Sequence, residues 1–193
     1  DEETFRTVCD VEFPVSRVLE GIENARQAGF ENIKINAVIK RGLNEHSVLP
    51  LARYFHGTGS ILRFIEYMDV GSTNNWKLDE VVSARELVAM INKEMPIEPV
   101  SPNYRGEVAK RWRYVDDGGE VGFITSVTES FCGDCSRVRL SAVGQIYTCL
   151  FATEGFDIRD PLRAGASDQD LLEIVQTLWG KREDRYSELR GQI

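Results

Sequence analysis

The residues with the clearest chemistry are three cysteines in one short segment. Cys132, Cys135 and Cys149 lie within FCGDCSRVRLSAVGQIYTCLF, residues 131–151. A Cys-x-x-Cys turn can direct two thiolates at a common metal, and a third can join them from a neighbouring strand. A predicted hairpin within residues 138–150 would return Cys149 to this turn. The spacing therefore predicts a metal site with three cysteine ligands.

A fourth protein ligand is not evident. The other candidates, Cys9, His46 and His56, come far earlier in the chain, and no spacing recommends them. A structural zinc site normally has four protein ligands, whereas an iron–sulfur cluster on three thiolates leaves one iron open to a substrate. The residues alone leave three alternatives open: an iron–sulfur cluster, zinc, or a thiol pair or cysteines without metal.

Two arginines follow the second cysteine. Arg137 and Arg139 are two residues apart, so on a strand they share one face, which begins at the cysteine loop. Their guanidinium groups match phosphate or carboxylate oxygens and can lie flat against a purine. The alternative is a pair of solvated arginines that form ion pairs with acidic residues.

Two predicted strands carry further polar candidates. Lys34 and Asn36 share one face of a strand within residues 31–40. In a parallel barrel this face would point inward near the strand's C-terminal end, where barrel active sites lie. Met68 ends the next predicted strand, where a methionine more often fills a core. Glu66 is an unusual carboxylate in this apolar strand and could pair with Arg63.

The hydrophobic periodicity predicts an α/β fold. Helix, strand, helix and strand alternate with short polar connections, which is typical of a parallel sheet or barrel. They are expected at residues 16–28, 31–40, 48–55 and 61–68. About two such units are too few to close a barrel, so a barrel parent would place this chain in its last part.

The C-terminal half is predicted to be rich in strands. A capping box at Ser83 and Glu86 starts a helix, and three prolines follow at positions 96, 99 and 102. We expect a domain boundary there, which gives domains 1–95 and 96–193. Strands are predicted at 105–114 and 119–127, a helix at 167–179, and a loosely held charged tail after it.

The composition limits the classes of function. With 193 residues and a net charge of −8, the chain can bury a core but lacks the basic surface for broad nucleic-acid binding. No apolar run is long enough to span a membrane, and the acidic N-terminal residues do not resemble a signal peptide. We therefore expect a cytoplasmic protein, in which clustered cysteines more often bind metal than form disulfides.

Taken together, the cysteine segment and the stretches RFIEYMDVG, KINAVIKRGLNE and DIRDPLRAG resemble the molybdenum cofactor biosynthesis protein A family. These are GTP 3′,8-cyclases of the radical S-adenosylmethionine superfamily. The resemblance implies the C-terminal part of an incomplete TIM-like (βα) barrel, followed by a small strand-rich domain with an iron–sulfur cluster. In this family a first [4Fe–4S] cluster cleaves S-adenosylmethionine to a 5′-deoxyadenosyl radical. The radical converts GTP to 3′,8-cyclo-7,8-dihydro-GTP, which passes to cyclic pyranopterin monophosphate synthase.

The resemblance also assigns roles to residues. It implies that Cys132, Cys135 and Cys149 hold the second [4Fe–4S] cluster, whose open iron accepts GTP. The residues implied to contact GTP are Arg137, Val138, Arg139 and Lys34, the two arginines being catalytic. Met68 is implied to contact S-adenosylmethionine, with Asn36 in the same pocket. Family members also tend to form homodimers.

One family motif is absent from this sequence. The Cys-x3-Cys-x2-Cys motif of the first cluster does not occur among the 193 residues. We therefore expect the chain to supply the GTP-binding cluster and to release no 5′-deoxyadenosine alone. Two alternatives remain: a non-enzymatic zinc or iron–sulfur module that stabilises a fold or binds a partner, and another radical S-adenosylmethionine enzyme with an auxiliary cluster.

Overall fold

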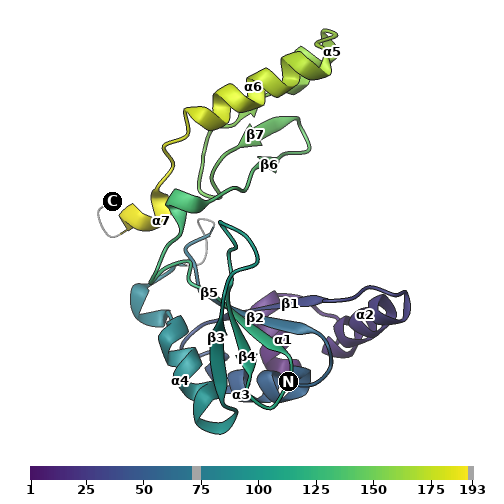
Figure 1. Ribbon diagram of the computed structural model, residues 1–193, viewed down its shortest axis with the longest axis vertical. Coiled ribbons are helices and arrows are strands. Elements are labelled where there is room, and N and C mark those ends of the chain that lie inside the picture. The colour runs from purple at the N-terminus through teal and green to yellow at the C-terminus, as the bar shows by residue number, and fades with distance from the viewer. Residues whose placement is uncertain (71–74, 191–193) are drawn as a thin grey trace. The chain divides into compact units, whose positions relative to one another are not determined.

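The computed structural model describes residues 1–70 and 75–190 and divides the chain into two compact units (Figure 1). The first unit comprises residues 1–130 and the second residues 131–193. This division lies well after the boundary expected at residues 95 and 96. No helix among the described residues is both long enough and apolar enough to cross a membrane.

The first unit is a mixed α/β layer. Its elements are α1 (Glu2–Cys9), α2 (Val15–Gln27), β1 (Lys34–Ile39), α3 (Val48–Phe55), β2 (Ile61–Glu66), α4 (Ala84–Glu94), β3 (Ile97–Val100), β4 (Lys110–Tyr114) and β5 (Glu120–Ile124), with single 3-10 turns before α3 and α4. The described strands form one sheet in the order β1-β2-β5-β4-β3. Strands β1, β2 and β5 pair in parallel, whereas β4 pairs antiparallel with both of its neighbours, β5 and β3. The predicted alternation of helix and parallel strand is thus confirmed for β1 and β2.

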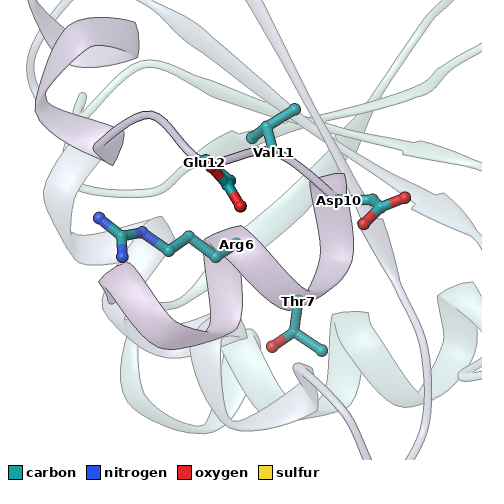
Figure 2. Close-up of a pocket in the computed structure, with 5 residues that line it drawn as sticks. All are labelled: Arg6, Thr7, Asp10, Val11 and Glu12. Carbon is teal, nitrogen blue, oxygen red and sulfur yellow. The ribbon is translucent and has the colours of Figure 1, made fainter.

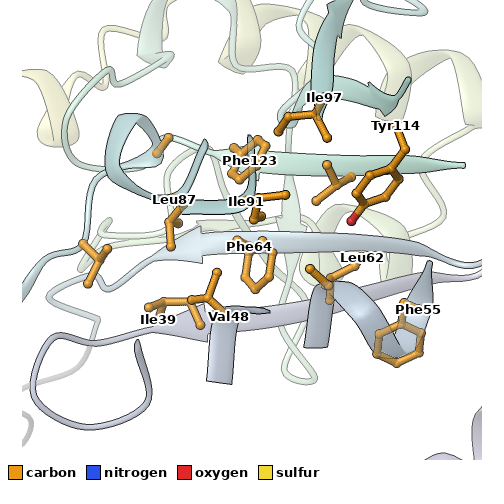
Figure 3. Packing of buried hydrophobic residues seen from close by; sticks show 14 residues of the cluster. Ile39, Val48, Phe55, Leu62, Phe64, Leu87, Ile91, Ile97, Tyr114 and Phe123 are labelled. Atoms are coloured by element: carbon orange, nitrogen blue, oxygen red, sulfur yellow. The ribbon is translucent and has the colours of Figure 1, made fainter. Parts of the chain in front are cut away.

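One face of this sheet carries the hydrophobic core. Leu62 and Phe64 alternate along β2 with partly exposed residues, and both are buried with Ile39 against α3 and α4 (Figure 3). Burial of each such side chain stabilises the fold by about 1.5–3 kcal/mol. Lys34 and Asn36 lie on the opposite face of β1 and are exposed. The two-faced strand predicted from the alternating pattern is therefore present.

The proline-rich segment does not separate two domains. Pro99 lies in β3, which pairs with β4 at the edge of the sheet. An edge strand tolerates proline because one side of the strand needs no backbone donor. The prolines therefore end helix α4, as expected, but the chain continues in the same sheet.

The second unit is smaller. Its elements are η3 (Cys132–Asp134), β6 (Arg139–Leu140), β7 (Gln145–Tyr147), β8 (Phe156–Asp157), α5 (Arg159–Arg163), α6 (Asp168–Gly180) and α7 (Tyr186–Leu189). Strands β6, β7 and β8 form an antiparallel sheet, which confirms the predicted hairpin. Helix α6 is found where the sequence predicts a helix, and it begins with a capping box of Ser167 and Asp170. Within the described part of the predicted charged tail, α7 packs on η3, so this part is held by the second unit; residues 191–193 lie outside the described chain.

Candidate functional site

The cysteine segment folds into a turn and a hairpin. Cys132 begins η3, and the backbone N–H of Cys135 donates to the Cys132 carbonyl at 3.3 Å. In the hairpin Arg139 pairs with Tyr147. Arg137 precedes β6 by two residues and Cys149 follows β7 by two, so the hairpin brings the chain back toward the turn. None of the three cysteines forms a disulfide.

The sulfur atoms have hydrogen-bond donors beside them. Arg137 Nη2 donates to Cys135 Sγ at 3.2 Å, and the backbone N–H of Phe151 lies 3.5 Å from Cys149 Sγ. Burial raises the pKa of Cys135, but the backbone and side-chain N–H groups of Arg137, with the charges of Arg137 and Arg182, lower it below the usual thiol value. The site therefore favours the thiolate, which is the form that binds metal.

Arg137 retains one unused donor. Its guanidinium lies 4.8 Å from the ring centroid of Phe131. Its Nε is buried and has no hydrogen-bond partner within the described part of the chain. In that part neither Arg137 nor Arg139 forms an ion pair with an acid. Val138 between them is half exposed. Arg137 and Arg139 are both only partly exposed.

No single-ion site is formed. Across residues 1–70 and 75–190, no three Cys, His, Asp or Glu side chains are grouped closely enough to hold one metal ion. The surroundings of the cysteines nevertheless suit an iron–sulfur cluster, because hydrogen bonds to cysteine sulfur and nearby cations are features of such sites. The hydrogen bonds to the sulfur atoms of Cys135 and Cys149 are therefore the structural support for a cluster.

The sequence does not predict the role of the C-terminal segment. Tyr186 in α7 stacks on Phe151 with 4.1 Å between ring centroids, two residues after Cys149. Arg182 donates to backbone carbonyls of the cysteine segment. In sequence these residues belong to a run of charges that resembles a solvated tail, and only the aromatic Tyr186 indicates packing.

Lys34 and Met68 lie at opposite ends of their strands. Lys34 is the first residue of β1 and pairs with Ile61, the first residue of β2. Met68 follows the last residue of β2 by two positions. The expectation that Lys34 lies near the C-terminal end of its strand is therefore wrong, because β1 begins at Lys34 itself. Asn36 Oδ1 accepts a hydrogen bond from Arg63 Nε at 2.9 Å.

Glu66 is buried and does not pair with Arg63. Its carboxylate accepts the N–H groups of Ala84 at 2.9 Å, Val127 at 2.9 Å and Thr128 at 2.8 Å, and the Thr128 hydroxyl at 2.5 Å. These contacts join the end of β2 to the start of α4 and to the segment after β5. Glu66 thus fixes the backbone two residues before Met68.

The remaining candidates for a fourth ligand have structural partners or are isolated. His46 lies 3.3 Å from Asp1, and His56 lies 3.0 Å from Asp116, whose pKa it lowers through this hydrogen bond. Cys9 is exposed at the end of α1. A hollow beside α1, shown in Figure 2, contains none of the predicted site residues; it is lined by Arg6, Thr7, Asp10, Val11 and Glu12.

The fold and the site together define a protein with a mixed α/β unit and a second unit that carries three free thiols and two nearby arginines. Residues 60–188 match the family model described as Molybdenum Cofactor Synthesis C. The chain belongs to this family, which confirms the resemblance drawn from the sequence.

Curated relatives extend this match to the whole chain. A protein of Acidothermus cellulolyticus named GTP 3′,8-cyclase is 50% identical over 97% of this chain and 53% of its own length. Proteins of the same name from Xanthomonas axonopodis pv. citri and Staphylococcus carnosus are 47% and 43% identical over 98% and 100% of the chain, and 56% of their own lengths. The chain spans about half the length of these relatives.

Proposed function

We propose that these residues form the cluster-binding and GTP-binding part of a GTP 3′,8-cyclase in molybdenum cofactor biosynthesis. The observation that carries the proposal is Arg137, which donates to a cysteine sulfur while its buried Nε has no partner in the described chain. A guanidinium in that position can bind an anionic nucleotide next to a metal group. The names of the relatives supply the nucleotide, GTP.

The cysteines would hold a [4Fe–4S] cluster. Cys132, Cys135 and Cys149 are its three ligands, and the bound cluster supplies one iron with an open coordination position for GTP. The hydrogen bond from Arg137 orients Cys135 Sγ and helps to lower the pKa of this thiol. Arg139 directs its unpaired guanidinium at phosphate oxygens.

The first unit would contribute the other contacts. We assign Lys34 to GTP, and Met68 with Asn36 to S-adenosylmethionine. On this proposal β1, β2 and β5 are the last parallel strands of an incomplete barrel whose inner face carries Lys34 and Asn36. The whole enzyme would act in the cytoplasm as a homodimer and pass its product to cyclic pyranopterin monophosphate synthase.

GTP binding tests the proposal. The anaerobically reconstituted chain should bind GTP in a titration calorimeter, and Arg139→Ala should weaken binding by about 10-fold or more, because a charged hydrogen bond contributes about 1.5–3 kcal/mol. Arg137→Ala should weaken it at least as much. The matched control is Arg163→Ala, since Arg163 is exposed on α5. Equal GTP affinity in the two variants and the wild-type chain would contradict the proposal.

Metal analysis separates the proposal from a zinc-binding module. We expect about four irons and four sulfides per chain after reconstitution, and loss of both in Cys135→Ser. One zinc per chain, without sulfide, would favour the non-enzymatic module instead.

A further inference from the structure

Arg182 makes an unusual number of contacts with the cysteine segment. Its Nη1 lies 3.3 Å from the carbonyl oxygen of Cys132 and 3.4 Å from that of Cys135. Its Nε lies 3.2 Å from the carbonyl oxygen of Thr148, the residue before Cys149. One guanidinium therefore joins the backbone at or next to all three cysteines.

The side chain of Arg182 is itself held in place. It is only 11% exposed, and its guanidinium lies 5.3 Å from the ring centroid of Trp179. Asp184 Oδ2 lies 3.4 Å from Arg182 Nε and also accepts the hydroxyl of Thr148 at 2.6 Å. Nη2 donates to the Asp184 carbonyl at 3.3 Å. The planar fork is thus fixed on both sides, by α6 and by the segment before α7.

This geometry differs from that of Arg137. Arg137 reaches a sulfur atom, whereas Arg182 contacts only backbone carbonyls of the cysteine segment. A group that bridges three backbone positions fixes the separations of the cysteines without occupying the site. The partners of Arg182 in this segment are backbone oxygens, which leaves the cysteine sulfur atoms free to bind a metal group.

We propose that Arg182 is a positioning residue that arranges the backbone of Cys132, Cys135 and Cys149 before the metal group binds. The proposal rests on the proposed function for the identity of that group, an iron–sulfur cluster. The planar fork is essential, because a lysine carries the charge but cannot present donors in fixed directions to three carbonyls. The expected consequence is faster and more complete uptake of the cluster.

Amide hydrogen exchange of the metal-free, reduced chain tests the arrangement directly. In Arg182→Gln the amides of Cys135 and Phe151, which are hydrogen-bonded within the segment, should exchange about fivefold faster or more. Amides of α6 should keep their wild-type rates. Lys181→Gln is the matched control, because Lys181 is adjacent, exposed and equally charged; it should leave all these rates unchanged.

Cluster uptake supplies the second measurement. Under anaerobic reconstitution, Arg182→Gln should take up iron and sulfide about fivefold more slowly than the wild-type chain and Lys181→Gln. Arg182→Lys should show the same two defects. If Arg182→Gln unfolds α6, Arg182→Lys decides the question.

The outcomes separate this inference from the proposed function. Unchanged exchange at Cys135 and Phe151 in both Arg182 variants overturns the inference, as does full rescue by lysine, which would mean that only the charge matters. A wild-type chain that takes up no iron contradicts the proposed function. The exchange measurement on the metal-free chain would still decide whether Arg182 arranges the cysteine segment.

Discussion

Glu66 shows how one buried side chain can organise several segments. Four donors from three residues converge on its two oxygens, and all are N–H or O–H groups. A carboxylate can accept all four, because it offers acceptor sites on both oxygens. The residue is therefore a structural anchor at the end of β2, and the reading of Glu66 as an ion-pair partner of Arg63 is wrong.

Replacement of Glu66 by glutamine should destabilise the fold. In Glu66→Gln an NH₂ group must face N–H donors, so at least one buried donor loses its acceptor and the free energy of unfolding falls by about 1–3 kcal/mol. Chemical denaturation at pH 7 measures this change. Glu20→Gln, an exposed position on α2, should change stability by less than about 0.5 kcal/mol. Equal stability of the two variants would refute the anchoring role.

Helix α4 shows how an element end is stabilised. Ser83 and Glu86 form a capping box. Glu86 also forms an ion pair with Arg41, which lies in the loop after β1; Arg41 Nη2 is 2.7 Å from Glu86 Oε1. The hydrogen bond from Arg41, then the backbone bond from Ser83, lower the pKa of Glu86 to about 2. The N-terminus of α4 is thus held by its own cap and by a neighbouring loop.

The depressed pKa predicts a pH dependence. Because the folded-state pKa lies below the ordinary value of 4.5, the contribution of Glu86 is complete above about pH 5 and is lost as the pH falls toward 2. Glu86→Gln should lower stability by about 0.5–1 kcal/mol at pH 7, since its side chain is 43% exposed. The difference from wild type should shrink between pH 5 and pH 3. A difference that stays constant over this range would contradict the assignment.

Elements with strong local rules were predictable from sequence. The capping box at Ser83, the helix that begins near Ser167 and the hairpin after the cysteines are found where their residues predict them. Strand β3 was not predictable, because Pro99 is tolerated there only by its position at the sheet edge. The contacts of Arg182 are also invisible in sequence, since they depend on tertiary contacts with residues more than 30 positions away.

At the scale of the whole molecule, the two units have different sources of stability. Residues 1–130 contain the buried core on the sheet, whereas helix α6 of the second unit has no fully buried residue. Trp179 lies in the second unit, and the other two tryptophans, Trp76 and Trp112, lie in the first. The units can therefore be followed separately by fluorescence.

Metal removal should affect the second unit selectively. A ligand stabilises only the folded state that binds it, so cluster loss should lower the unfolding midpoint of residues 131–190. In Trp76→Phe/Trp112→Phe, the fluorescence of Trp179 should report this decrease as metal is removed with a chelator. The unfolding midpoint of the first unit should not change; it is followed by the fluorescence of Trp112 in the double variant Trp76→Phe/Trp179→Phe. Equal shifts in both units would show that the metal site does not belong to the second unit alone.

The edge position of β3 has a consequence for self-association. A free strand edge is a template on which a further strand can add, and proteins that expose two such edges risk open-ended aggregation. At β3, Pro99 removes a backbone donor and Glu98 adds charge, so growth of the sheet from this side is disfavoured. Addition of a further strand to the described sheet is therefore less hindered beside β1 than beside β3.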